Sequence, residues 1–535
     1  MRRRMLRAMF GSSLYRYRLR ARPPKALALT TEGRWPGEPA NATAILRGEL
    51  RFAGETVRDP APIWSPPGAS EAWLASFHRF GWLADLAALG TPSARETGRM
   101  LFRSWLDEHE ATWKPLPWRA DVLGQRLVAW ISHLDDFTTA DDPLRPRILE
   151  SLARQLRHLG RVAAWEVGGS GRLTALKGLI FGLAATTAGE RRIAKVLKLL
   201  EREVAAQIKP DGGHVSRCPA VQVAVLSDLI DVRAAIKAVH VAVPGWLQSA
   251  IDRAAPMVRF FRHGDGRLAH FNNTAEEYGP HLDLVLTRAE AKGKAPGSAP
   301  HSGFQRLTAG RTIVVADTGP APPPGLDEHA FAGTLSFEMS YGRERLIVNC
   351  GAYRGQNPEW RRVPRTTAAH STLTIGDTNS AEVRPDLTLG RRPVHVACER
   401  MEEDGSQWIT ASHDGYAGPF GLIHRRMLFL SADGEDLRGE DRLNARPGAS
   451  FTVRFHLHPS VEVSLTDAGA LLRLPSGTAF RLRAQGAQVG LAESIYLGTG
   501  DMTKSRQVVL SGPVGSQGVT VKWAIRRDNR KPAEE

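Results

Sequence analysis

Seven polar side chains stand out because they lie where predicted helices and strands begin or end, and loops at such places often carry binding and catalytic groups. Histidine exchanges protons near neutral pH, arginine pairs with carboxylates, and asparagine can donate to an oxygen that gains charge. These residue types suit acid–base chemistry and the binding of anionic groups. The seven candidates are His214, Arg217, His263, Asn272, His329, Arg365 and His370.

The candidates fall in four stretches, and each stretch also has a purely structural explanation. The stretches are KPDGGHVSRCPA (209–220), FFRHGDGRLAHFNNTAEEYG (260–279), HAFAGTLSFEMSYGRERLIVNCGAYRG (329–355) and WRRVPRTTAAHSTLTIG (360–376). Asp211 can cap a turn, and HGDG is typical of a turn. The third stretch predicts a β-hairpin in which Leu335, Phe337 and Met339 point one way, so that His329 marks its entrance.

Other common catalytic patterns are absent from the sequence. It contains no GxSxG, GxxxxGK[ST] or HExxH motif, and no GxGxxG follows a predicted strand. Its three cysteines form no CxxC pair, which argues against a structural zinc site. His456 and His458 share one face of a predicted strand, but no third ligand accompanies them. The sequence therefore predicts neither a metal site nor a cofactor.

Hydrophobic periodicity divides the 535 residues into a helical part and a β part. Apolar residues recur at helical spacing through seven or eight segments between about residues 71 and 290, and short turns between them favour antiparallel helix pairs. Residues 291–303 are small and polar and predict a linker, and residues 304–535 alternate like a dozen short strands. No apolar run is long enough to span a membrane.

Residues 1–70 are rich in proline, glycine and arginine, and they begin with a basic arm. The formal net charge is +15, and residues 1–25 hold eight arginines, one lysine and no acid. No apolar stretch follows the first basic cluster, so the segment does not have the pattern of a signal peptide. Two interpretations remain open: a disordered arm, or a short amphipathic helix that contacts an anionic membrane surface.

These motifs resemble those of the heparinase II/III family of polysaccharide lyases. Residues 329–355 resemble the family's HAHAD-LSFEL hairpin with its DPGTY turn, RTTAAHSTLTIGDTNS resembles its R-S-T-A-A-H-N-T segment, and PDGGHVSRCP resembles its D-G-G-H-x-x-x-S-P segment. The resemblance covers roughly residues 70 to 530. It implies an incomplete α/α toroid followed by an antiparallel β-sandwich.

The resemblance also implies a reaction, the cleavage of a uronate-containing glycan by β-elimination. A base removes the proton next to the uronate carboxylate, polar groups neutralise that carboxylate, and a general acid protonates the leaving oxygen. By this resemblance the expected catalytic residues are His214, His329 and His370. The expected substrate contacts are Arg217, His263, Asn272 and Arg365.

Several positions depart from the family pattern. The second histidine of HxH, a metal ligand where metal is bound, falls on Phe331, and the acid of HAHAD falls on Gly333. The acid of the DPG turn, another ligand, falls on Asn349, whereas the third ligand is kept as His370. Phenylalanine has no lone pair and an amide is a poor zinc ligand. The departures therefore predict that no metal binds here.

The helical part departs as well, so three functions are open. The family's Asn-His pair falls near Ser170 and Gly171, and its catalytic tyrosine falls on Val221. One function is a lyase that acts on an acidic polysaccharide, and the second is a degenerate, glycan-binding protein of the cell envelope. The third is a scaffold whose basic arm contacts lipid or nucleic acid; the first two involve no nucleic acid. The resemblance favours the periplasm or cell envelope, with the cytoplasm as the alternative.

Overall fold

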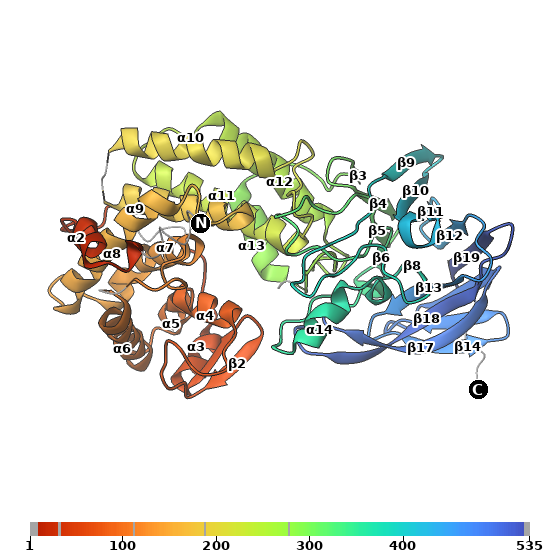
Figure 1. Ribbon diagram of the computed structural model, residues 1–535, viewed down its shortest axis with the longest axis horizontal. Helices are drawn as coiled ribbons and strands as arrows, with labels where there is room; N and C mark the ends of the chain where they lie inside the picture. The colour runs from red at the N-terminus through yellow and green to blue at the C-terminus, as the bar shows by residue number, and fades with distance from the viewer. Residues whose placement is uncertain (1–8, 30–33, 111–112, 187–188, 277–278, 529–535) are drawn as a thin grey trace. The chain divides into compact units, whose positions relative to one another are not determined.

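The computed structural model describes residues 9–29, 34–110, 113–186, 189–276 and 279–528 (Figure 1). The chain forms two compact units: Met1–Gln207 with Ser227–Ile251, and Ile208–Leu226 with Asp252–Glu535. This division departs from the boundaries expected at residues 291–303, because residues 208–226 and 252–290 group with the β part. The reason is local pairing: Asp211 accepts hydrogen bonds from Ser302, and Arg306 donates to the carbonyl oxygens of Phe260 and Arg262.

The helical elements follow one another with short connections, as the periodicity predicts. Ser70 and Thr91 cap α4 and α6 by accepting backbone N–H groups of the first turn, and Gly90 ends α5 with a positive φ. No described helix has both the length and the apolar composition of a membrane span. The helices are α2 Ser13–Leu19, α3 Pro39–Leu46, α4 Glu71–His78, α5 Trp82–Leu89, α6 Pro92–His109, α7 Ala120–Phe137, α8 Leu144–Val162, α9 Gly169–Ala185, α10 Glu190–Gln207, α11 Pro219–Ala238, α12 Gly245–Phe260 and α13 Gly279–Ala289.

Helices α7 and α9 pack with their backbones in contact. A Cβ atom on Gly178 would lie 2.3 Å from the Cα atom of Gly124, so neither position has room for a side chain. Beside this crossing, the buried Lys177 Nζ lies 2.6 Å from an Asp228 oxygen and 3.2 Å from an Asp231 oxygen. Its ion pairs offset part of the cost of burying the charge.

The β part is an antiparallel sandwich of two sheets, which confirms the expected order of helices followed by a sandwich. One sheet has the order β14-β15-β16-β19-β12-β11-β10-β9, and the other has the order β17-β18-β13-β7-β6-β5-β4-β3 with β8 paired to β13. The strands are β3 Ser298–Ala299, β4 Phe304–Ala309, β5 Thr312–Asp317, β6 Phe337–Tyr341, β7 Glu344–Val348, β8 Leu373–Ile375, β9 Val396–Glu403, β10 Ser406–Tyr416, β11 Leu422–Leu430, β12 Asp436–Leu443, β13 Ser450–Leu457, β14 Glu462–Thr466, β15 Gly469–Arg473, β16 Ala479–Gln485, β17 Gln488–Tyr496, β18 Thr503–Pro513 and β19 Val519–Arg527.

Several short elements complete the chain. A two-stranded hairpin near the N-terminus pairs β1 with β2, so residues 1–70 hold regular structure besides the arm. The short elements are β1 Glu49–Phe52, β2 Glu55–Arg58, α14 Pro358–Arg362, the 3-10 turns Val363–Arg365 and Thr367–Ala369, and α15 Ala417–Phe420.

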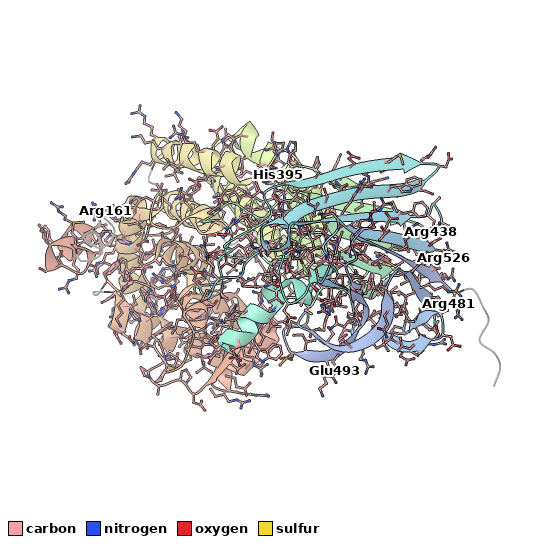
Figure 2. The ribbon with its side chains drawn as sticks, turned by 45° about the vertical axis from the view of Figure 1, so that its right-hand side comes forward. Arg161, His395, Arg438, Arg481, Glu493 and Arg526 are labelled. Carbon is pink, nitrogen blue, oxygen red and sulfur yellow. The ribbon has the colours of Figure 1, made fainter. Side chains whose placement is uncertain are left out.

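Aromatic side chains fill the space between the two sheets. Phe337 on β6 stacks on Trp523 on β19, with ring centroids 5.6 Å apart, and Phe455 on β13 meets the same tryptophan edge-on at 4.8 Å. The sheet that contains β12 and β19 has a charged outer side. There Arg438 and Arg526, both labelled in Figure 2, share Asp436 as an ion-pair partner. Strands β12 and β19 therefore bury an apolar face and expose a charged face, as in other sandwiches.

Candidate functional site

Strand β6 alternates as predicted, but both of its faces are buried. Phe337 and Met339 join the sandwich core, whereas Glu338 and Ser340 point to the other side. There His263 places Nε2 3.1 Å from a Glu338 oxygen and Nδ1 3.0 Å from the Ser340 hydroxyl. Burial, joined by the charge of Arg345, holds the pKa of His263 well below its usual value. His263 is thus part of a buried polar network and not of an open surface.

That network continues along β7. Arg345 donates to both carboxylate oxygens of Asp265 through Nε and Nη2. Its third nitrogen, Nη1, lies 3.3 Å from Nε2 of His270. Glu338 also accepts the backbone N–H of Asn349 at 2.8 Å. These contacts fix the hairpin β6–β7 against residues 263–270 of the same unit.

His329 lies in the loop that precedes β6, eight residues before the strand, and not at its first position. Arg365 holds this loop: its guanidinium donates to the carbonyl oxygens of Glu328 at 2.9 Å and Ala330 at 3.2 Å, on either side of His329. The same guanidinium lies 5.2 Å from the ring centroid of Phe331. Burial lowers the pKa of Arg365 to about 10, which leaves it charged at neutral pH.

The His329 ring is the most accessible of the histidine candidates, with 28% of its side chain exposed. Asn273 Nδ2 lies 3.0 Å from Nδ1, and a Glu328 oxygen lies 3.1 Å from Nε2. An amide donor on Nδ1 and a carboxylate on Nε2 are compatible with one neutral tautomer, in which Nε2 carries the proton. The arrangement offers a proton donor at Nε2, while the lone pair of Nδ1 is occupied.

His370 is buried behind His329's loop. Its Nδ1 donates to the carbonyl oxygen of Thr366 at 2.8 Å, and its ring meets Phe331 edge-on at 5.8 Å. A Cβ atom on Gly333 would lie 2.6 Å from Cδ2 of His370, so the ring occupies the space that an acidic side chain at 333 would need. Burial lowers the pKa of His370 to about 4, and the residue is neutral at pH 7.

His214 is fixed by the start of α11. Its Nδ1 lies 2.7 Å from the Ser216 hydroxyl, and its backbone N–H donates to Gln222 Oε1 at 2.6 Å. Burial is the main cause that lowers the pKa of His214 to about 4, and the nearby imidazole of His329 adds to it. Gln222 also donates to the carbonyl oxygens of Gly212 and Ala254, so it braces the turn that carries His214.

Arg217 is fully engaged within the protein. Its five N–H groups donate to four carbonyl oxygens and to Asp317, with which it forms a buried ion pair. Its guanidinium also lies 4.5 Å from the ring centroid of Phe304. In this structure Arg217 has no donor left for a substrate carboxylate, so it fastens residues 302–320 to the segment before α11.

Asn272 has a comparable structural part. Its amide donates to the Arg217 carbonyl oxygen at 2.8 Å and accepts the Phe331 backbone N–H at 3.0 Å. Asn272 and Asn273 both have positive φ, a conformation that asparagine tolerates better than most residues. This turn directs Asn273, and not Asn272, toward His329. The adjacent asparagines in the sequence indicate a polar site, but the sequence alone does not show which of the two contacts His329.

The residues at the family's ligand positions do not fit a metal ion. Phe331 lies buried against His370 and Arg365. Asn349 accepts the Ser371 backbone N–H at 3.0 Å with its amide oxygen. No group of three or more His, Cys, Asp or Glu side chains that could hold a metal ion occurs in the described part of the chain.

The positions where the resemblance places catalytic groups of the helical part also lack suitable side chains. Val221 lies in the first turn of α11 and is buried, and it has no hydroxyl. Ser170 and Gly171 lie in the first turn of α9 and supply neither an amide nor an imidazole. The described candidates thus leave His329 with Asn273 and Glu328 as the accessible polar group, in a setting where the other histidines are buried and neutral.

Comparison with known proteins gives one family and two kinds of relatives. The family model "Heparinase II/III-like, C-terminal" matches residues 291–524. FtsZ-localized protein C from Caulobacter vibrioides is 31% identical over an alignment that covers 97% of this chain and 94% of that protein. Among solved structures, heparinase III aligns with a TM-score of 0.74 at 15% identity, covering 97% of this chain and 89% of the other. The heparan sulfate lyase HepC from Pedobacter heparinus aligns with a TM-score of 0.60 at 16% identity, covering 97% and 88%. These two structures share the fold: helices followed by an antiparallel sandwich.

Proposed function

The chain belongs to the heparinase II/III-like family, and we propose that it is a divergent member that no longer cleaves glycans and instead acts as a binding protein that localises with FtsZ. The observation that carries this proposal is the 31% identity to FtsZ-localized protein C along 97% of this chain. An identity that extends through both units points to a shared role of the whole chain. The solved lyases, at 15% and 16% identity, support the fold alone.

The packing around His370 supports the loss of lyase chemistry. Phe331 and Gly333 stand at two positions where the lyases carry polar groups, and the His370 ring fills the space between them. Restoring an acid at 333 would require His370 to move. Arg217 donates all five of its N–H groups within the protein, and Arg365 holds the loop of His329, so neither is placed to neutralise a uronate.

The first experiment measures lyase activity. Purified protein is incubated with a panel of uronate polysaccharides, and the ultraviolet absorbance of the unsaturated product is recorded. We expect no more product than from the His329→Ala variant. A product that forms with the native protein and is lost by about 100-fold or more in His329→Ala, the loss typical of a general acid–base group, would overturn the proposal.

The second experiment tests the association with FtsZ. A fluorescent fusion of the full chain is imaged together with labelled FtsZ, and the purified chain is sedimented with FtsZ polymers. We expect both to coincide with FtsZ, whereas a heparinase-fold lyase treated in the same way should not. A diffuse fusion that also fails to sediment would contradict the proposal. Co-localisation would also assign the chain to the compartment that holds FtsZ, in place of the periplasm expected from the lyases.

The exposed His329 favours a second candidate function, which has two forms. The chain would either cleave a uronate glycan or bind an acidic glycan without cleaving it. The His329 ring has Asn273 on one nitrogen and Glu328 on the other, so a bound sugar could receive a proton from Nε2. The same polysaccharide panel in a calorimetric titration separates the two forms of this candidate. Binding that weakens as salt rises, without product, would favour a glycan-binding protein.

Contact of the N-terminus with an anionic membrane surface stays part of the proposal. In the described part of this segment Met9, Leu14 and Tyr17 are exposed, and Arg18 follows on α2. Exposed apolar side chains beside arginines are typical of segments that lie on a membrane surface. Sedimentation with vesicles that contain an anionic phospholipid should therefore retain the full chain and lose a chain that starts at residue 21. Equal retention of both chains would show that the N-terminal arm does not bind the vesicles.

A further inference from the structure

A groove on the helical unit combines an aliphatic floor with a cationic rim. It encloses about 650 Å³ and is lined by one face each of α8, α9 and α10 and by residues 21–24. On α8 the lining positions recur at spacings of three and four residues from Ala153 to Arg161, so they share one side of the helix. Cavities of this size hold small-molecule ligands in other proteins.

The floor consists of aliphatic side chains. Leu156 on α8, Leu179 and Leu183 on α9 and Val196 on α10 line it, and the described residues that line the groove include no aromatic side chain. Gly160 opens the middle of the groove, because a Cβ atom there would meet only one Leu179 methyl group, at 3.9 Å. A floor of this kind suits a hydrocarbon chain. It offers no ring on which a base or a sugar could stack.

The rim carries positive charges that have no acidic partner among the described residues. Arg22, Arg157, Arg161, Arg192 and Lys195 line the groove, and none of them forms an ion pair with a carboxylate of the described residues. Arg157 and Arg161, the latter labelled in Figure 2, are held in place because each donates to the Arg18 carbonyl oxygen, at 3.4 and 3.1 Å. The groove thus presents fixed cations above an apolar surface.

We propose that this groove binds a single-chain anionic amphiphile, with the hydrocarbon chain on the aliphatic floor and a phosphate or carboxylate head at the cationic rim. An anion relieves the repulsion among the five cations, and its chain covers the apolar surface that the floor shows to the groove, although Leu179, Leu183 and Val196 are otherwise buried. An inorganic anion would leave that surface uncovered, and a neutral amphiphile would leave the cations without an anionic partner. The site is built entirely from residues of the helical unit.

The probe is dodecyl phosphate below its critical micelle concentration, titrated calorimetrically into the full chain, with inorganic phosphate and neutral dodecyl maltoside as separate arms. We expect one molecule of dodecyl phosphate to bind, and at least ~10-fold weaker binding in the other two arms. Equal affinity for inorganic phosphate would reduce the groove to an anion site, and equal affinity for dodecyl maltoside would remove the role of the rim. Either result overturns the proposal.

Matched variants locate the binding. Arg192→Ala with Lys195→Ala should weaken dodecyl phosphate by about 10-fold or more, because charge-assisted contacts are lost. Arg191→Ala with Lys198→Ala removes the same charge from α10 at exposed positions that do not line the groove, and it should leave the affinity unchanged. Gly160→Leu should fill the groove and abolish binding while the helix stays folded, since leucine favours helix more than glycine does. Unchanged binding in Gly160→Leu, or equal losses in the two double variants, would show that dodecyl phosphate does not bind in the groove.

Discussion

Arg426 on β11 should be essential to the stability of the sandwich, and replacing it by methionine tests this. Its guanidinium forms two hydrogen bonds with the Asp441 carboxylate, at 2.8 and 3.1 Å, where neither side chain is open to solvent. It also donates to the carbonyl oxygens of Leu335, at 2.8 Å, and Ser371, at 2.9 Å. Arg426 therefore ties the loop before β6 and the residue after His370 to the opposite sheet.

The expected cost follows from the charge that the substitution leaves behind. Removing one partner of a buried ion pair costs about 3–5 kcal/mol, because the other charge stays buried without compensation. Asp441 would keep two donors, His424 Nε2 at 2.7 Å and Trp523 Nε1 at 2.9 Å, so we expect a loss near the lower end, about 3 kcal/mol. Methionine keeps most of the aliphatic packing.

The pH dependence has a definite sign. Burial opposes the ionisation of Asp441, but Arg426 and His424 outweigh it and hold the pKa of this carboxyl well below its usual range. A carboxyl with a lowered pKa stabilises the fold above its unfolded value of about 3.9, and this contribution is lost as the pH falls. The difference in unfolding free energy between the native protein and Arg426→Met should therefore be full at pH 7 and shrink below about pH 4.

Hydrogen exchange against urea measures the effect in the sandwich alone. Peptides from β11 and β12 are followed by mass spectrometry, so that unfolding of the helical unit does not contribute. Arg425→Met is the matched control, because Arg425 precedes Arg426 on the strand and is exposed. We expect a change within about 0.5 kcal/mol for the control. Equal losses in the two variants would refute the reasoning.

Four further predictions follow from single contacts. The purified protein should contain no stoichiometric metal and should keep its melting temperature in chelator, since Phe331 stands at a ligand position; tightly bound zinc would show that the ligand set is misassigned. Gly333→Ala should lower the unfolding free energy by about 1–3 kcal/mol in a urea titration, because the new Cβ atom would press on His370; native-like stability would mean that the ring can move aside. Burial lowers the pKa of His370 to about 4, so the stability that this neutral ring contributes is present above its unfolded pKa of about 6.5 and is lost toward pH 4. Between these pH values the unfolding free energy should therefore fall less steeply in His370→Gln than in the native protein. Identical slopes would argue against a neutral buried ring. Trypsin should cut first after Lys292 or Lys294, which are exposed in the segment before β3, or in the basic arm; a first cut inside α9 would contradict the packing described for that helix.

Periodicity in the sequence was enough to predict helices followed by short strands, because the spacing of apolar residues depends on local geometry alone. The antiparallel sandwich was expected from the resemblance to the heparinase II/III family. Periodicity also predicted that Phe337 and Met339 share one face of a strand. It did not predict that Glu338, on the other face, is equally buried, because that depends on His263, 75 residues earlier in the chain. The grouping of residues 208–226 with the β part depends on long-range contacts for the same reason, since Asp211 meets Ser302 only after folding.

The sequence also identified polar residues at the ends of elements, but only the tertiary structure decided what each of them does. Arg217 has the chemistry to bind a carboxylate, yet its donors are taken by carbonyl oxygens that lie 85 to 103 residues further along the chain. Whether an arginine is available depends on such long-range partners, and residue type and spacing carry no record of them. His329 and His370 look equivalent in the sequence, and folding leaves the first accessible and encloses the second behind Phe331. Burial then decides which ring can exchange a proton with solvent, because a buried imidazole resists charging.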